Sequence, residues 1–110
     1  MGRFVSGEEV VIPFPFSDLS ATKRRPELVV AALPSDDVIL CQITSQPVSN
    51  AFAIGLTPLD FVTGGLNRPS TIRPERIFTA DEHIILRSVG KITDTKLRDV
   101  AAIITRIVTP

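Results

Sequence analysis

The sequence has little of most residue types that carry catalytic chemistry. Its 110 residues include no tryptophan, no tyrosine, one cysteine and one histidine, and the formal net charge is zero. A single cysteine excludes an internal disulfide and a zinc site built from several cysteines. Zero net charge removes any global attraction to nucleic acid or to a membrane surface. A binding site for a polyanion must therefore be a local patch.

Motifs that mark common enzyme classes are missing as well. The chain contains no P-loop, no GxGxxG segment and no HExxH segment. The one histidine, His83, follows two acids in an expected turn, where a surface position is typical. A Ser–His–Asp arrangement would have to use this residue. We therefore expect no cofactor, no metal and no triad.

Length and hydropathy bound the organisation and location of the chain. A length of 110 residues fits one domain, residues 1–110. The apolar runs are far shorter than the roughly 20 residues of a membrane helix. The opening Met1-Gly2-Arg3 is not followed by the apolar stretch of a signal peptide. We expect a cytoplasmic protein that does not associate with a membrane.

The apolar pattern predicts several short strands and one long helix. Leu97, Val100, Ala101, Ile104 and Val108 recur at helical spacing. Cys41 falls in an apolar strand, where a small buried hydrophobe is expected. The predicted strands are Glu8–Phe14, Pro26–Leu33, Val38–Ser45, Phe52–Leu56, Pro69–Arg73 and Arg76–Thr79. Pro74 separates the last two strands. One helical turn is predicted at Leu59–Phe61 and the long helix at Asp94–Val108. This pattern predicts a mainly β fold: a small, partly open barrel with a C-terminal helix packed on it.

A basic cluster directly precedes the second predicted strand. If strands 26–33 and 38–45 form an antiparallel hairpin, Arg25 lies near Thr44 and Ser45. The planar guanidinium of arginine suits phosphate, and Pro26 restricts Arg25 to an extended conformation that fixes its direction. The alternative is that Lys23-Arg24-Arg25 is an ordinary solvated face.

A second pair of charged residues stands at Arg73-Pro74-Glu75. Residues two apart in an extended segment face the same way, so this guanidinium and carboxylate are expected to lie side by side. One interpretation is a surface ion pair worth about 0–1 kcal/mol. The other is a general base, Glu75, beside a cation that stabilises phosphate, Arg73.

The order of the short motifs resembles a known family. GEEVV at residues 7–11, PFPFSD at 13–18, KRRP at 23–26, ITSQ at 43–46, STIRPERIFT at 70–79 and VGKI at 89–92 follow one another over nearly the whole chain. Together they resemble the PemK/MazF-like toxins of bacterial type II toxin–antitoxin systems. The resemblance implies an SH3-like barrel of the PemK/MazF/CcdB type and a homodimer. It also implies a cognate antitoxin and metal-independent cleavage of single-stranded RNA, by attack of the ribose 2′-hydroxyl on the adjacent phosphodiester.

The resemblance also assigns residues to that chemistry. Arg25 and Thr44 match the arginine before proline and the threonine of the family's strand end. Arg73 and Glu75 match an Arg-x-Asp pair of the PemK branch that supplies acid and base, with glutamate in place of aspartate. The implied catalytic set is therefore Arg25, Thr44, Arg73 and Glu75, and the implied RNA-binding set is Phe16, Ser17, Lys23, Arg24, Ser45 and Gln46.

Two other functions are compatible with the same fold. One is a related toxin that binds a protein target such as DNA gyrase without catalysis. The other is an interaction module that has lost its activity. Cleavage of a mixed-sequence RNA in EDTA distinguishes an RNA-cleaving toxin from both.

Overall fold

A computed structural model describes residues 3–15, 22–65 and 68–110, apart from the side chains of residues 14, 15, 22 and 23. The chain forms strands β1, β2, β3, β4, β5, β6 and β7, a C-terminal helix α1 and two short 3-10 turns, η1 and η2. Their bounds are Glu8–Pro15, Thr22–Ala32, Asp37–Thr44, Ile54–Leu56, Phe61–Gly64, Ser70–Asp81 and Arg87–Ile92 for the strands, Asp94–Val108 for α1, Pro58–Asp60 for η1 and Glu82–Ile84 for η2.

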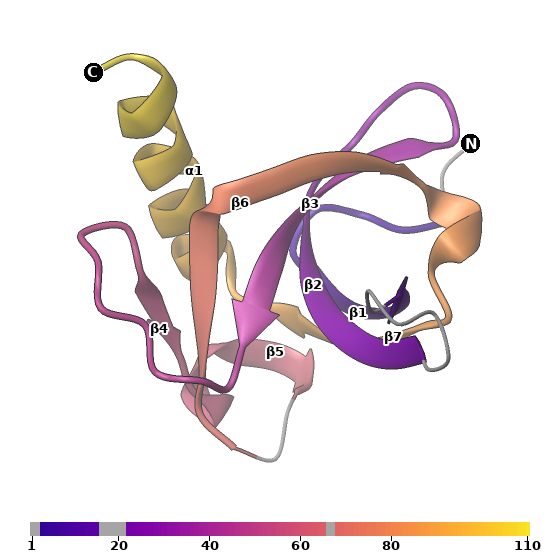
Figure 1. Ribbon diagram of the computed structural model, residues 1–110, viewed down its shortest axis with the longest axis horizontal. Helices are drawn as coiled ribbons and strands as arrows, with labels where there is room; N and C mark the ends of the chain where they lie inside the picture. The colour runs from indigo at the N-terminus through magenta and orange to yellow at the C-terminus, as the bar shows by residue number, and fades with distance from the viewer. Residues whose placement is uncertain (1–2, 16–21, 66–67) are drawn as a thin grey trace.

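The strands form one curled, antiparallel sheet in the order β4-β6-β3-β2-β1-β7-β5. Figure 1 shows this sheet wrapping into a half-barrel, with α1 standing beside the bend of β6. β4 and β5 are neighbours in the chain but form opposite edges of the sheet. The predicted mainly β fold with a partly open barrel and a C-terminal helix is confirmed.

Each face of the sheet carries its own apolar cluster. The first cluster lies on the face that α1 covers and consists of Leu28, Cys41, Ile43, Leu56, Ile72, Ile92 and Val100. The second lies on the other face and consists of Val10, Ile12, Val29, Val38, Leu40 and Ile85. The near-continuous apolar runs of β2 and β3 are explained by this arrangement, because both faces of these central strands are covered. Cys41 is fully buried, as predicted.

α1 has the bounds that the sequence predicts. Its backbone begins after Thr93, whose Oγ1 accepts a hydrogen bond of 3.2 Å from the Lys96 amide and so satisfies one free N–H of the first turn. Val100 is fully buried against the sheet, and Leu97 and Ile104 pack beside it. No helix in the described ranges is long and apolar enough to cross a membrane.

Several elements differ from the sequence prediction. Residues 70–81 form one strand rather than two separated by Pro74, because β6 passes the proline in a bulge. Cys41 pairs with Ile77 whereas Gln42 pairs with Arg73, so three residues of β6, 74–76, have no partner on β3. A bulge tolerates proline because its residues need not donate to the neighbouring strand. β2 begins at Thr22 instead of Pro26, so the basic cluster lies within this strand rather than before it. β4 begins at Ile54 instead of Phe52. β5 was not predicted, and η1 spans Pro58–Asp60 instead of Leu59–Phe61.

Candidate active site

The central strands β2, β3 and β6 bring the predicted arginines and threonine to one face of the sheet. Glu27 pairs with Gln42, and Gln42 pairs in turn with Arg73. The ladder between β2 and β3 ends at the Glu27–Gln42 pair, and Arg25 and Thr44 are the next residues that face the same side of the sheet. The predicted hairpin is therefore confirmed, and the two residues occupy neighbouring positions at its open end.

The two predicted charges on β6 do lie side by side. Arg73 Nε donates to Glu75 Oε2 at 3.0 Å, and Asn50 Nδ2 donates to the same oxygen at 3.0 Å. Burial alone would raise the pKa of Glu75. Hydrogen bonds from its own backbone amide, Arg73 and Asn50 outweigh this effect and hold the pKa below its usual value. Glu75 is thus a weak base at neutral pH, but it orients the Arg73 guanidinium.

The hydroxyl of Thr44 is held at the end of β3. Its Oγ1 accepts a hydrogen bond of 3.1 Å from the backbone amide of Gln46. The hydroxyl hydrogen is not used by that bond, so Thr44 can donate it to an anion. A phosphate bound between Arg25 and Thr44 would accept from both side chains.

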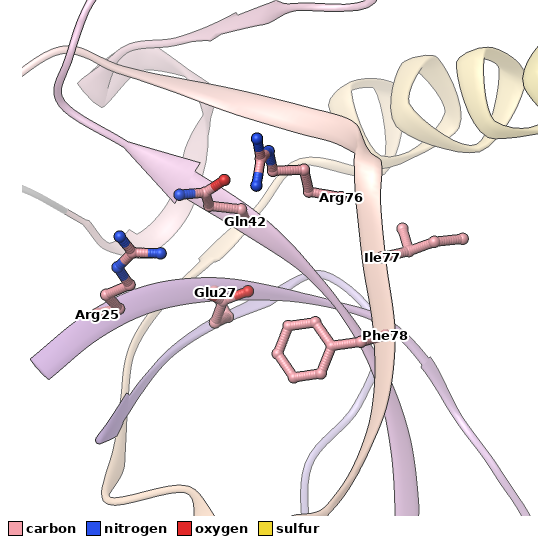
Figure 2. Close-up of a pocket in the computed structure, with 6 residues that line it drawn as sticks. All are labelled: Arg25, Glu27, Gln42, Arg76, Ile77 and Phe78. Carbon is pink, nitrogen blue, oxygen red and sulfur yellow. The ribbon is translucent and has the colours of Figure 1, made fainter. Parts of the chain in front are cut away.

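A cavity of about 240 Å³ opens beside Arg25 on the same face of the sheet. Figure 2 shows Arg25 and Glu27 on β2, Gln42 on β3 and Arg76 and Phe78 on β6, with the Phe78 ring directed toward Glu27. Ile77 also borders the cavity, but its side chain points away from the Phe78 ring. Two arginines, an amide, a carboxyl group and an aromatic ring therefore surround one space.

Glu27 is the most unusual of these residues. Its side chain is only 1% exposed, and Oε1 has no hydrogen-bond partner among the described residues. Burial raises the pKa of Glu27 to about 7, although the nearby Arg25 guanidinium opposes the effect. Near neutral pH the group is therefore shared between its charged and uncharged forms.

The predicted RNA-binding residues are placed unevenly. Phe16 and Ser17 lie outside the described residues, as does the Lys23 side chain. Arg24 is exposed and, as the neighbour of Arg25 in a strand, faces the opposite side of the sheet. Ser45 and Gln46 are exposed directly after β3.

His83 stands away from this site, and its exposed position agrees with the surface position that was predicted. It is exposed and contacts the Asp81 carboxylate through Nδ1. Asp81 pairs with Asp37, at the opposite end of β3 from Thr44. Within the described ranges, no group of three or more His, Cys, Asp or Glu side chains is arranged to hold a metal ion.

Sequence reasoning missed Glu27, Arg76 and Phe78. For Glu27 a signal existed. It is the one acid in the run Pro26–Leu33, and it stands two residues after Arg25, so both face the same way. Arg76 and Phe78 reach the cavity only through the bulge of β6, which the sequence does not reveal.

The chain matches one family of small toxins. Residues 6–108 match the family described as PemK-like, MazF-like toxin of type II toxin–antitoxin system, so the chain belongs to that family. No curated protein sequence matches the chain significantly.

Solved structures of toxins share the fold at low sequence identity. An endoribonuclease from a mycobacterial species is 16% identical with a TM-score of 0.73, over 99% of this chain and 94% of the other. A chain of the MazE–MazF complex from Deinococcus radiodurans is also 16% identical, with a TM-score of 0.78 over 96% of both chains. The Mycobacterium tuberculosis toxin MazF-mt6 is 18% identical with a TM-score of 0.67, over 91% of this chain and 96% of the other.

Proposed function

We propose that the protein is an endoribonuclease toxin that cleaves single-stranded RNA without a metal ion, through attack of the ribose 2′-hydroxyl on the adjacent phosphodiester. The observation that carries this proposal is the placement of Arg25, Thr44 and Arg73 on one face of the sheet, on three adjacent strands, in a chain of this toxin family. Similar folds in structures described as endoribonucleases support the same activity.

The arginines have an electrostatic role in this scheme. Arg25 donates to the non-bridging oxygens of the scissile phosphate, with Thr44 donating from the adjacent strand. Arg73, held by Glu75, adds positive charge where negative charge grows in the transition state. Because an arginine stays protonated, neither Arg25 nor Arg73 takes up the proton of the 2′-hydroxyl.

Partners follow from the same proposal. A toxin of this kind requires a cognate antitoxin, and structures with this fold include an endoribonuclease in complex with its cognate antitoxin. We also propose a homodimer, and a cytoplasmic location where RNA and the antitoxin are available. The exposed residues Ser45, Gln46 and Arg24, with Phe16, Ser17 and Lys23, are proposed to contact RNA outside the cleaved bond.

Incubation of the purified protein with a mixed-sequence RNA in EDTA tests the activity. Cleavage with 2′,3′-cyclic phosphate and 5′-hydroxyl ends is expected. Arg25→Ala should lower the rate about 100-fold or more, because a charged donor to the transition state is removed. The change in the free energy of unfolding should be about 1 kcal/mol or less.

Arg98→Ala is the matched control, because it removes an exposed arginine from α1. This variant should cleave at the wild-type rate. Wild-type rates for Arg25→Ala would contradict the assignment of the phosphate site. Intact RNA together with growth arrest in cells would instead favour a toxin that acts on a protein target.

A further inference from the structure

Glu27 has no evident structural reason to be a carboxylic acid. It lies in the central strand β2, buried where this strand lines the cavity, and burying a carboxylate there costs free energy. Its Oε1 accepts no hydrogen bond from any described residue, so no such bond offsets the desolvation of this atom. A costly buried acid that lines a cavity is typical of a functional group.

The carboxyl group is close to the proposed phosphate site. Glu27 and Arg25 are two residues apart on β2 and face the same way, so their Cα atoms are about 7 Å apart. Figure 2 shows both side chains on the same wall of the cavity. A nucleotide whose phosphate is held by Arg25 would place its ribose within reach of the Glu27 carboxyl group.

Glu75, the other carboxylate considered as a general base, is already engaged in hydrogen bonds. Glu75 Oε2 already accepts hydrogen bonds from Arg73 and Asn50, both at 3.0 Å. Glu75 is also absent from the lining of the cavity beside Arg25. These contacts suit a residue that positions Arg73, and they leave the proton transfer to another group.

We propose that Glu27 is the general base of the reaction, taking the proton from the ribose 2′-hydroxyl of an RNA held by Arg25. The proposal rests on the endoribonuclease function proposed above. In the step, the 2′-oxygen gives its proton to the Glu27 carboxylate and forms a bond to phosphorus. The bond between phosphorus and the 5′-oxygen breaks, and that oxygen takes a proton from water. Glu27 then returns its proton to the solvent, so one proton moves in total from the 2′-oxygen to the 5′-oxygen.

The surroundings of Glu27 fix the expected pH dependence. The charged groups that line its cavity are Arg25 and Arg76, whereas its strand neighbours Val10 and Gln42 carry no charge. Burial, opposed in part by Arg25, raises the pKa of Glu27 to about 7. The cleavage rate should therefore rise tenfold per pH unit up to about pH 7 and level off above it, as the carboxylate form becomes fully populated.

Single-turnover cleavage of a fluorophore-quencher RNA in EDTA, measured from pH 5.5 to 8.5, tests the proposal. Glu27→Gln keeps the shape of the side chain but cannot accept a proton. We expect its rate at pH 8 to fall about 100-fold or more and to lose the inflection near pH 7. The Kd for the same RNA carrying a 2′-O-methyl group at the cleaved position should stay within threefold of wild type. This binding measurement also establishes that the variant is folded.

Glu9→Gln is the matched control. Burial raises the pKa of Glu9 to about 7 as well, but Glu9 pairs with Leu28 and does not line the cavity. Its substitution should leave the pH–rate profile unchanged. Glu75→Gln should lower the rate, through Arg73, while keeping the inflection.

Three results would overturn the proposal: wild-type cleavage that is flat between pH 6 and 8, a Glu27→Gln variant that keeps the inflection, or a loss in that variant that lies wholly in the Kd. In each of these cases RNA is still cleaved, so the proposed function would stand and only the base would be wrong. Intact RNA with wild-type protein would overturn both.

Discussion

Glu9 allows the cost of a buried acid to be measured. Its side chain is 0% exposed, and neither carboxylate oxygen has a hydrogen-bond partner among the described residues. Burial raises its pKa from 4.5 to about 7. At about 1.4 kcal/mol for each pH unit, ionised Glu9 destabilises the fold by about 3 kcal/mol. This is an upper value, because water that reaches the carboxylate would reduce it.

The sign of the effect follows from the two pKa values. Below about pH 4.5 Glu9 is protonated in both the folded and the unfolded chain, so it does not lower the free energy of unfolding. Between about pH 4.5 and 7 the unfolded chain releases its proton first, so the free energy of unfolding falls as the pH rises. Above about pH 7 Glu9 is ionised in both the folded and the unfolded chain, and the full destabilisation of about 3 kcal/mol is present. Glu27 adds a second contribution with the same sign.

Glu9→Gln removes the Glu9 contribution and leaves that of Glu27. We expect the loss of stability between pH 5 and pH 8 to be smaller in the variant than in the wild type by up to about 3 kcal/mol. For an m-value of about 1–3 kcal/mol per molar urea, this is a difference of about 1 M or more in the transition midpoints. The chain has no tryptophan or tyrosine, so unfolding must be followed by far-ultraviolet circular dichroism.

Asp99→Asn provides the control, because it removes an exposed carboxylate of α1. Its pH dependence should match the wild type within about 0.5 kcal/mol. All three proteins must be compared at one protein concentration, since any association shifts the apparent stability. Equal pH dependence of wild type and Glu9→Gln would refute the reasoning, because it would mean that the buried carboxyl group is solvated in the folded protein.

Two further predictions concern packing. Gly90→Ala should destabilise the fold by about 2 kcal/mol or more in urea titrations, because its Cβ would lie 2.6 Å from Gly65 N and 2.7 Å from Thr63 O. Gly55→Ala, whose Cβ meets nothing within 4 Å, should change stability by less than about 0.5 kcal/mol; an equal loss in both variants would contradict the steric argument. Burial and the charges of Glu27 and Glu75 raise the pKa of the Cys41 thiol, so it should react with an aromatic disulfide reagent about 100-fold or more slowly in the folded protein than in urea. Rapid native labelling would show that the first apolar cluster opens readily.

The elements that the sequence predicted best are those specified by local pattern. α1 combines a sustained apolar stripe with a capping threonine, and both its bounds were predicted. The β2–β3 hairpin was predicted because two apolar runs flank a short turn, and this placed Arg25 beside Thr44. The site residues predicted from it depended only on strand alternation and antiparallel pairing.

The elements that were missed depend on partners far along the chain. β5 is a short strand that exists because it pairs with β7, about 30 residues later. Pro74 suggests a break when only its neighbours are considered, yet β3 holds both halves of β6 in place around the bulge. Glu27 shares a face with Arg25 by strand alternation, but the cavity that gives it importance forms only when β6 packs beside β3.

The order of strands in the sheet has a consequence for synthesis of the protein. β1 emerges first from the ribosome, but one of its two neighbours is β7, which ends at Ile92. The hairpin partners β2 and β3 can pair early, whereas the second side of β1 stays open until β7 has been made. Pairing between such distant segments is slow and forms late. The complete sheet, and any activity that depends on it, therefore cannot form in the cell before β7 has been synthesised.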